Sequence, residues 1–421
     1  MILKIPDKVL LLVCCYVILP KNKQELLLRI VICHNYYQQR GGEDVVVEAE
    51  VELLRSKGHQ VELVSVHNDT LKNVFSKLGA LLTFQHSPYY KTLLCKKIKQ
   101  FKPDLVHIHN TFPLLTPSIL DACNDLSIPV ICTLHNYRLI TPSAIFSWTD
   151  SVDSIALAKS VFSHIVKRSY RDSYIATAIV AWLIEFHKKK QTWHKKVDRF
   201  ICLSQSSKAI FCHAGLCSDK ISVKPNFAPQ PSVDGLLSPA DKQLKYLLFV
   251  GRLSKEKGLE TLLSAARLID APLKIIGGES RIFKAENDNP KVTFLGELNR
   301  SGVQKQLRGA SALIVPSECY ETFGMVAIEA FSLGIPVICS KLGALADIVQ
   351  DGYTGLHFKP ANPGDLAEKI NYLLSNDKLL NKMSINARRE YLTKYTPEVN
   401  YHQLITIYNQ TINETALVDN Q

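Results

Sequence analysis

Residues 316–340 (PSECYETFGMVAIEAFSLGIPVICS) constrain the fold more than any other part of the chain. The apolar run 312–315 precedes them and is typical of a buried strand. Gly334 and Pro336 end the following helix in the way that a C-terminal glycine and a later proline do. The pattern predicts a strand, a loop, a helix and a second strand, whose loop lies at the sheet edge where open α/β sheets bind ligands.

Two carboxylates frame this predicted helix. Glu321 lies just before the helix and Glu329 lies inside it. Phe323, Gly324 and Met325 would present backbone N–H groups to a polar ligand, because the first N–H groups of a helix have no partner within it. An ionised glutamate only accepts hydrogen bonds, whereas sugar hydroxyls donate them, so the pattern favours a hydroxyl-rich ligand. Solvated charges at a helix end are the alternative interpretation.

A second group of polar residues follows an apolar run about seventy positions upstream. Residues 246–250 (YLLFV) are typical of a buried parallel strand, and the loop 251–258 (GRLSKEKG) leads into a predicted helix, 259–268. Arg252 can clamp phosphate oxygens with its planar fork, and Lys257 adds a mobile charge, which suits a diphosphate. A solvated surface loop is again the alternative.

The chain alternates predicted strands and helices throughout its 421 residues, which indicates two domains built on parallel sheets. Residues 228–241 (APQPSVDGLLSPAD) break the periodicity and are predicted to be the linker. Eleven cysteines with no C-x-x-C pair are typical of reduced core residues in a cytosolic protein. The predicted strands are 29–33, 60–66, 105–109, 130–134, 200–203, 221–224, 246–250, 273–276, 292–295, 312–315, 337–339 and 355–358.

These motifs together resemble the retaining GT-B glycosyltransferases, specifically family 4. The resemblance spans roughly residues 28–400 and rests on several motifs in the expected order. It implies an α/β protein of the GT-B fold, with two Rossmann-like, doubly wound parallel-sheet domains facing a cleft. It also implies sugar transfer from a nucleotide-sugar donor with retention at the anomeric carbon. The matching motifs are the loop 251–258, the pair Glu321 and Glu329 in an E-x7-E pattern, and the segments 103–120, 129–139 and 197–211.

The resemblance divides the chain into four parts. Residues 1–27 form an N-terminal extension, 28–230 the acceptor-side domain, 231–399 the donor domain, and 400–421 a helix that returns toward the first domain. The extension departs from the family pattern. Its apolar run, 9–19, is too short to span a membrane and no convincing cleavage site follows, so we expect a start-site artefact or a disordered or membrane-touching extension rather than export.

In the second domain the resemblance assigns the donor site. Arg252 and Lys257 stabilise the departing diphosphate, Glu321 contacts the donor sugar, and Glu329 accepts hydrogen bonds from the ribose. Gly277, after a predicted strand, permits close approach of the nucleotide. The backbone N–H groups of Phe323, Gly324 and Met325, at the start of the predicted helix, belong to the same donor site.

In the first domain Gly41 and Gly42 follow the first predicted strand and let the backbone approach a diphosphate or sugar, although a plain loop glycine is the alternative for each. Gly42 matches the family's donor-contacting glycine. His135 resembles the histidine whose side chain or backbone carbonyl touches the transferred sugar. We therefore expect the catalytic group to comprise His135, Glu321, Arg252 and Lys257.

Three further residues are candidate acceptor contacts: His109, Asn136 and Arg138. His107 and His109 alternate along one strand and point to the same face, and we interpret His107 as a satisfied core histidine. No D-x-D triplet occurs in the chain, so no aspartate pair is available to hold a metal on the phosphates. The sequence thus predicts a metal-independent enzyme without a cofactor, and the resemblance implies a UDP- or GDP-linked sugar as its donor.

Other activities on a similar fold stay open at this point. A dinucleotide-dependent oxidoreductase is disfavoured, because the first strand leads into HNYYQQRGGED rather than G-x-G-x-x-G. A nucleotide-sugar epimerase, a phosphorylase and a non-catalytic nucleotide-sugar-binding partner remain as alternatives. For transfer we expect front-face substitution, in which the departing phosphate oxygen takes the proton of the acceptor hydroxyl and the protein supplies position and charge.

Charge suggests where the reaction takes place. The 50 Lys and Arg residues exceed the 39 Asp and Glu residues by eleven, and cations gather in 95–102, 167–171 and 187–196. No nucleic-acid-binding motif accompanies them. An acceptor that is a saccharide or a lipid-linked glycan would bring such a surface to an anionic membrane. We expect a cytoplasmic, peripheral enzyme of glycan or polysaccharide biosynthesis that contacts the membrane through 156–187 and its flanking cations.

Overall fold

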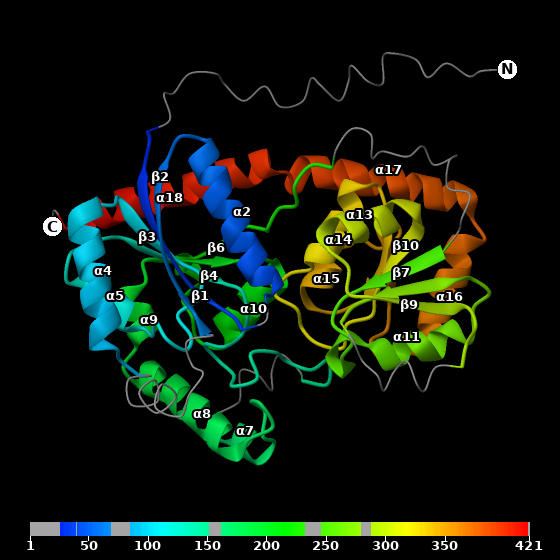
Figure 1. The fold of residues 1–421 in the computed structure, drawn as a ribbon, viewed down its shortest axis with the longest axis horizontal. Helices are drawn as coiled ribbons and strands as arrows, with labels where there is room; N and C mark the ends of the chain where they lie inside the picture. Colours follow the sequence, from blue (N-terminus) through cyan, green and yellow to red (C-terminus); the bar gives the residue numbers. More distant parts are fainter. Residues whose placement is uncertain are drawn as a thin grey trace.

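The computed structural model describes residues 26–38, 40–68, 85–150, 161–231, 246–278 and 288–419. These residues form two α/β domains side by side, each built on a six-stranded parallel sheet (Figure 1). The α/β fold with two Rossmann-like domains is thereby confirmed. Residues 1–25 of the predicted extension and 232–241 of the predicted linker lie outside the described residues.

The first sheet has the strand order β2-β1-β3-β4-β5-β6. Its strands are β1 (Arg29–Tyr36), β2 (Gln60–His67), β3 (Leu105–Ile108), β4 (Val130–Leu134), β5 (Arg199–Cys202) and β6 (Ile221–Val223). The helices of this half are α2 (Gly42–Ser56), α4 (Pro88–Phe101), α5 (Ser118–Asn124), α7 (Ser163–Val166), α8 (Tyr174–Lys189), α9 (Thr192–Lys196) and α10 (Gln205–His213), with a 3₁₀ turn η2 (Ser218–Lys220).

The second sheet has the order β12-β11-β10-β7-β8-β9. Its strands are β7 (Tyr246–Val250), β8 (Leu273–Ile276), β9 (Val292–Gly296), β10 (Ala310–Val315), β11 (Val337–Ser340) and β12 (Gly355–Phe358). The 3₁₀ turn η5 (Lys255–Lys257) follows β7. The helices are α11 (Leu259–Ala266), α13 (Arg300–Gly309), α14 (Met325–Ser332), α15 (Gly343–Ile348), α16 (Pro363–Leu374) and α17 (Asp377–Lys394).

Helices cover both faces of the second sheet. Because successive side chains of a strand point to opposite faces, one continuous apolar run contributes to both cores. Along β10, Leu313 and Val315 join the core beneath α14, whereas Ala312 and Ile314 join the core beneath α11 and α16. A continuous apolar sequence is therefore required here. It places the carboxyl ends of β7 and β10, which are neighbours in the sheet, next to each other.

The last helix, α18 (Pro397–Asp419), returns to the first domain. In Figure 1 it is the red helix that runs along the side of the first sheet. Tyr401, Leu404 and Tyr408 are buried in one core cluster with Ile30 and Ile32 of β1. The helix begins at Pro397, three residues before the predicted 400–421 segment. It thus closes one face of the sheet that carries the first half of the site.

The apolar segment near 156–187 is partly described. The helices described in it, α7 and α8, project from the lower edge of the first domain in Figure 1. Thr177, Val180 and Ile184 of α8 are buried against the domain, in agreement with a helix that packs one face on its neighbours. Among the described residues there is no helix with the length and apolar character needed to cross a bilayer.

Candidate active site

The two donor loops predicted from sequence are locked together at the carboxyl ends of β7 and β10. Gly258 has a positive φ of 70°, and a Cβ atom at this position would lie 1.8 Å from the carbonyl oxygen of Pro316. The backbone N–H of Glu318 donates to the carbonyl of Glu256 at 2.9 Å. Glycine is required here because only it adopts this conformation and leaves room for the second loop.

This arrangement brings a cation and a carboxylate from the two loops into contact. Lys257 Nζ lies 2.9 Å from Glu321 Oε1, with the side chains 23% and 15% exposed. Ser317 Oγ donates a hydrogen bond to the same carboxylate oxygen. Burial acts to lower the pKa of Lys257, but the Glu321 carboxylate opposes this and the pKa lies above its usual value. Lys257 is therefore charged at neutral pH.

Arg252 lies at the rim of the same site. Its side chain is 74% exposed, and its Nη2 atom lies 3.5 Å from Glu256 Oε1. An ion pair this exposed holds its side chain weakly. The guanidinium group is thus free to turn toward an anionic ligand beside Lys257.

The helix α14 places the second carboxylate of the E-x7-E pattern. Met325 is its first residue and Gly324 its N-cap. A Cβ atom on Gly324 would lie 2.7 Å from Cδ2 of the buried Leu345, so a larger residue here would displace that side chain. Phe323 is buried. Burial raises the pKa of Glu329 above its usual value, against a smaller opposite effect of Arg300.

Gly277 serves the protein's own packing. Its backbone N–H donates to the carbonyl of Gly296 at 3.0 Å. A Cβ atom there would lie 2.2 Å from the carbonyl oxygen of Gly251 and 2.9 Å from the side chain of Leu253. The sequence suggested close approach of a nucleotide, whereas the described contacts show close approach of the loop after β7. The glycine is needed for that contact whether or not a nucleotide also lies near it.

The first domain meets these loops directly. His135 follows β4, and its backbone carbonyl accepts a hydrogen bond from Thr322 Oγ1 at 2.6 Å. The N–H of Tyr320 donates to the carbonyl of Phe146 at 2.8 Å. Thr322 lies next to Glu321, so the E-x7-E loop is tied to the loop that carries His135. The carbonyl of His135 thus accepts one hydrogen bond from the protein, and its imidazole ring is a further group that can contact a substrate.

The glycine pair lies at the start of α2. Gly41 is the N-cap of α2, and its N–H donates to Asp44 Oδ2 at 2.9 Å. Asp44 also lies 2.8 Å from Nε2 of the fully buried His34. A Cβ atom on Gly41 or Gly42 would meet no described atom within 4 Å. The space over both glycines is open, in contrast to Gly258 and Gly277.

His109 has a different position from that proposed for an acceptor contact. It is buried; its Nδ1 lies 2.8 Å from His135 Nε2, and its Nε2 lies 3.2 Å from Glu50 Oε1. Both ring nitrogens thus face protein atoms, and His109 backs His135 instead of offering a nitrogen to an acceptor. His107 is the satisfied core histidine that we expected: it is buried and hydrogen-bonded to Tyr408 and Thr133.

Asn136 leads to a carboxylate that sequence reasoning missed. Its Nδ2 lies 3.3 Å from Glu43 Oε2 and 3.2 Å from Tyr37 Oη, and Tyr37 donates to Glu43 at 3.1 Å. Glu43 Oε1 is buried with no hydrogen-bond partner among the described residues. Burial raises the pKa of Glu43 to about 8, although the hydrogen bonds from Tyr37 and Asn136 lower it. The only signal in the sequence is its place directly after the glycine pair.

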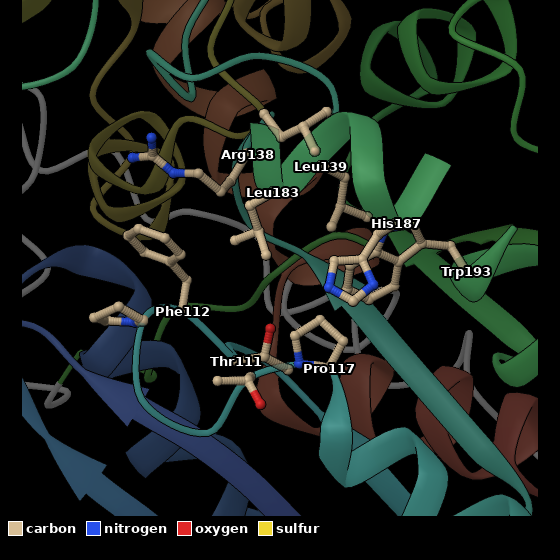
Figure 2. Close-up of a pocket in the computed structure, with 11 residues that line it drawn as sticks. Thr111, Phe112, Pro117, Arg138, Leu139, Leu183, His187 and Trp193 are labelled. Carbon is tan, nitrogen blue, oxygen red and sulfur yellow. The ribbon is translucent and has the colours of Figure 1, made fainter. Parts of the chain in front are cut away.

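Arg138 lines a pocket beneath α8. Its guanidinium carbon lies 5.1 Å from the ring centre of Phe112 and 4.8 Å from that of Tyr170. Figure 2 shows Arg138 and Phe112 on one side of the pocket and His187 and Trp193 on the other. The pocket is a small hollow of about 40 Å³ with a mainly apolar lining. An arginine beside such a lining suits an acceptor with both polar and apolar parts.

Two family models match the two halves of the chain. Residues 40–229 match Glycosyltransferase Family 4, and residues 238–390 match Glycosyl transferases group 1. The chain is a family 4-like GT-B glycosyltransferase. Each match contains the motifs of its own half, so the site described above lies within the part of the chain that the two models cover.

Relatives and solved structures agree with this assignment. The chain is 28% identical over 311 residues to an uncharacterized glycosyltransferase of Methanocaldococcus jannaschii, which covers 70% of this chain and 72% of that protein. It is 26% identical over 373 residues to the sulfoquinovosyl transferase of Arabidopsis thaliana, covering 82% of this chain and 66% of the relative. Neither name is that of an epimerase or a phosphorylase.

Among solved structures the fold is shared over almost the whole chain. Sucrose-phosphate synthase from Thermosynechococcus elongatus superposes with a TM-score of 0.66 at 19% identity, covering 91% of this chain and 99% of that one. HepE from Anabaena, in complex with UDP-glucose, superposes with a TM-score of 0.59 at 17% identity, covering 93% and 100%. At such low identity these structures support the GT-B fold alone.

Proposed function

We propose that this glycosyltransferase moves a sugar from a nucleotide-sugar donor to a saccharide or lipid-linked glycan acceptor, with retention of the anomeric configuration and without a metal. The observation that carries the proposal is the ion pair of Lys257 and Glu321, which joins the two donor loops and is tied through Thr322 to the loop of His135. A cation for phosphate, a carboxylate for sugar hydroxyls and a histidine thus meet where the two domains touch.

The donor's diphosphate would bind to the two cations. Arg252 supplies a planar fork with little to hold it elsewhere, and Lys257 is charged and already positioned. The chain has no D-x-D triplet, which supports a site in which protein cations replace a metal. HepE, which shares the fold, is in complex with UDP-glucose, so a UDP-linked donor is the first to test here, with a GDP-linked one as the alternative.

The sugar and the ribose would be held by the two glutamates. Glu321 accepts hydrogen bonds from sugar hydroxyls while Lys257 fixes its orientation, and Glu329 accepts them from the ribose, as the resemblance to family 4 implies. Phe323, Gly324 and Met325 supply backbone N–H groups at the start of α14. The ring of His135 meets the transferred sugar from the opposite domain.

The proposed reaction is a front-face substitution. The bond between the anomeric carbon and the phosphate oxygen breaks, that oxygen takes the proton of the acceptor hydroxyl, and the acceptor oxygen bonds to the anomeric carbon on the same face. Glu321 is paired with Lys257, which lowers its reactivity as a nucleophile in a double displacement. Arg252 and Lys257 stabilise the charge that develops on the departing diphosphate.

The acceptor would enter from the side of the first domain. Asn136 and Glu43 lie beside His135, and Arg138 leads from them to the apolar pocket beneath α8. Polar groups near the reacting centre and apolar walls farther away suit a glycan whose other end is a lipid. This arrangement supports a role in glycan or polysaccharide biosynthesis at the cytoplasmic face of a membrane.

The outer face of α7 and α8 supports contact with an anionic membrane. Val166, Tyr174 and Ile175 are 79%, 56% and 76% exposed, and Trp182 is 41% exposed. Three lysines, 188–190, are exposed at the end of α8. Apolar and aromatic side chains flanked by cations are the composition of surfaces that bind the headgroup region of anionic lipids.

A donor screen tests the proposed site without knowledge of the acceptor. Thermal unfolding is followed with UDP, GDP and ADP in the presence of EDTA. A ligand at 100 times its dissociation constant should stabilise the protein by about 2.7 kcal/mol. We expect one of the first two to stabilise the wild type and not the Arg252→Ala, Lys257→Ala double variant, while Lys291→Ala, an exposed change in the same domain, keeps the effect. Stabilisation only with added Mg²⁺, or equal stabilisation of the double variant, would contradict the site.

A further inference from the structure

The ring of His135 is backed by buried groups that lead into the core of the first domain. Its Nε2 lies 2.8 Å from Nδ1 of His109, and the other nitrogen of His109 lies 3.2 Å from Oε1 of Glu50. His109 is 6% exposed and Glu50 is 1% exposed. A buried carboxylate, a buried histidine and the proposed sugar-binding histidine thus form one row.

Glu50 is held in place from the side of α18. Its Oε2 lies 3.3 Å from Nζ of the buried Lys224, which also donates to Oδ1 of Asn400 at 3.2 Å. Its Oε1 lies 3.2 Å from Nδ1 of His107, and that nitrogen is hydrogen-bonded to the hydroxyl of Tyr408 at 2.7 Å. Asn400 and Tyr408 belong to α18, so the returning helix anchors the start of the row.

The same atoms have the spacing of a metal centre, since ligand atoms of Glu50, His107 and His109 lie within 4.8 Å of one another. The charges and hydrogen bonds favour another role. The ammonium group of Lys224 would repel a cation beside Glu50, and both ring nitrogens of His107 are already hydrogen-bonded, to Tyr408 and Thr133. These groups therefore form a buried polar cluster of the protein itself.

Electrostatics determine which groups carry protons. Burial would raise the pKa of Glu50, but Lys224 and the two histidines hold it well below its usual value, so the carboxylate is ionised. Burial, with a smaller effect of His107, lowers the pKa of His109 to about 3. Burial and then His109 lower the pKa of His135 as well. Each of these two imidazoles is neutral at pH 7 and has one N–H.

We propose that Glu50 and His109 are positioning residues that fix the tautomer of His135, with the proton on Nε2 and a bare Nδ1. Nε2 of His109 lies 3.2 Å from Glu50 Oε1, outside regular hydrogen-bond geometry, and neither atom has a hydrogen-bond partner elsewhere among the described residues. Because an ionised carboxylate only accepts hydrogen bonds, its proximity favours the proton of His109 on Nε2. Nδ1 of His109 is then an acceptor, and Nε2 of His135 must donate to it.

Only Nδ1 of His135 remains to contact a substrate, and its protonation state determines the role of His135 in the reaction. A bare Nδ1 can only accept a hydrogen bond, and a sugar hydroxyl can donate one. The row therefore makes His135 an acceptor toward the donor sugar and holds its ring in place. This role rests on the proposed function, whereas the tautomer itself is a property of the protein without substrate.

The tautomer can be measured directly by NMR of protein labelled with ¹⁵N in its histidine rings, because the protonated and bare ring nitrogens of neutral imidazole have distinct shifts. The His135 signals are assigned by their loss in His135→Asn. We expect the wild type at pH 7 to have the His135 proton on Nε2. A proton on Nδ1, or a doubly protonated ring, would overturn the proposal even if the enzyme transfers sugar.

A variant tests whether His109 imposes this state. His109→Phe keeps a ring of similar shape but removes the acceptor, so both tautomers of His135 should become populated. In the transfer reaction kcat should fall about 10- to 100-fold, which is the usual effect of mutating a residue that orients a functional histidine. The change in KM for the donor should be smaller. The Glu50→Leu, Lys224→Met double variant removes the buried pair together and should have the same two effects.

The matched control is His59→Phe, which breaks a buried hydrogen bond of 2.9 Å to Tyr401 at the same α18 interface without contact to His135. It should lose stability but keep the wild-type tautomer and kcat. An unchanged tautomer in His109→Phe would refute the positioning role. Should that variant not fold, the wild-type spectrum still decides the assignment. Absence of any transfer activity with the predicted tautomer present would count against the proposed function alone.

Discussion

At the scale of single residues, the site is organised by pairs that neutralise each other. Lys257 and Glu321 come from different loops, and each has a partner before any donor binds. Because both positions are set in advance, the donor meets a cation and an acceptor that need no rearrangement, which is the condition for strong electrostatic stabilisation of a transition state. Arg252, in contrast, is exposed and gains its partner only when an anion arrives.

We predict that Glu321→Ala and Arg252→Ala each lower turnover by on the order of 10²-fold or more, because each removes a group that contacts the donor. Arg252 is 74% exposed, so the unfolding temperature of Arg252→Ala should change little. Glu321 is 15% exposed and paired with Lys257, so Glu321→Ala should lower the unfolding temperature but keep the circular dichroism spectrum of the folded protein at the assay temperature. Glu260→Ala and Arg267→Ala are matched controls on the exposed surface of the same domain. Turnover near the wild-type value in both site variants would remove these residues from the site.

A second residue-scale prediction concerns the pH dependence of stability. The pKa of Glu43 is raised to about 8 in the folded protein, so the unfolded chain loses this proton at lower pH than the folded one. The contribution of Glu43 to the free energy of unfolding therefore falls as pH rises from about 4.5 to 8. Glu43→Gln removes this effect, and should be more stable than the wild type by about 1–3 kcal/mol at pH 8 but equal to it near pH 4.

Thermal unfolding across this pH range is the measurement. Glu48→Gln, on the exposed side of the same helix, is the control. The change in its unfolding temperature between pH 4 and pH 8 should equal that of the wild type. If the Glu43→Gln and wild-type curves stay parallel from pH 4 to 8, the raised pKa is wrong.

The sequence identified some site residues and could not identify others. Glu321 and Lys257 were found because they lie in motifs at the ends of predicted strands. Glu43 lies in no such motif, and its raised pKa depends on Tyr37 and Asn136, which approach it only in the folded chain. The contacts of His109 with His135 and Glu50 had no signal in the sequence for the same reason, since Glu50 is distant along the chain.

At the scale of elements, strands and loops differ in how far the sequence determines them. β4, β7, β8 and β12 have the predicted bounds, because each is a short apolar run that both faces of a sheet must bury. β1 continues three residues beyond its predicted end at Cys33, since β2 pairs with it along the whole length. The interlocking of the donor loops has no local signal and depends on the contact between Gly258 and Pro316.

That contact yields a prediction on the donor loops. Gly258→Ala should destabilise the protein by about 2–4 kcal/mol, because the new Cβ combines an unfavourable backbone conformation with a clash against Pro316. Gly352→Ala is the control: it has a similar φ of 73° but no atom within 4 Å of the added Cβ, so about 1 kcal/mol is expected. Equal losses of unfolding temperature in the two variants would show that the loops are not locked at this point.

At the scale of the whole molecule, the chain crosses from one domain to the other twice. It passes from β6 to β7, in the interval that contains the predicted linker, and it returns through α18. The return was predicted from the resemblance rather than from periodicity. Its buried contacts through Asn400 and Tyr408 reach Lys224 and His107 near the site, so the end of the chain supports the first domain from within.

The charge distribution gives a prediction for the whole molecule. Cosedimentation with anionic liposomes should be salt-sensitive, and the Lys188→Glu, Lys189→Glu, Lys190→Glu variant should bind about 100-fold more weakly, since each cation near the surface contributes about 1 kcal/mol. The control reverses three exposed lysines of the other domain, Lys305, Lys378 and Lys382, and keeps the same net charge. Lack of binding at low salt, or equal loss in the control, would refute membrane contact through α8.

The most direct test of the central claim follows transfer itself by proton NMR. The enzyme is incubated in EDTA with α-linked UDP- and GDP-sugars and with octyl glycosides, which offer a saccharide hydroxyl and an apolar tail. We predict that one donor's anomeric signal is replaced by that of an α-linked glycoside, and that Glu321→Ala abolishes this change. A β-linked product, or transfer that starts only when a divalent metal is added, would contradict the account.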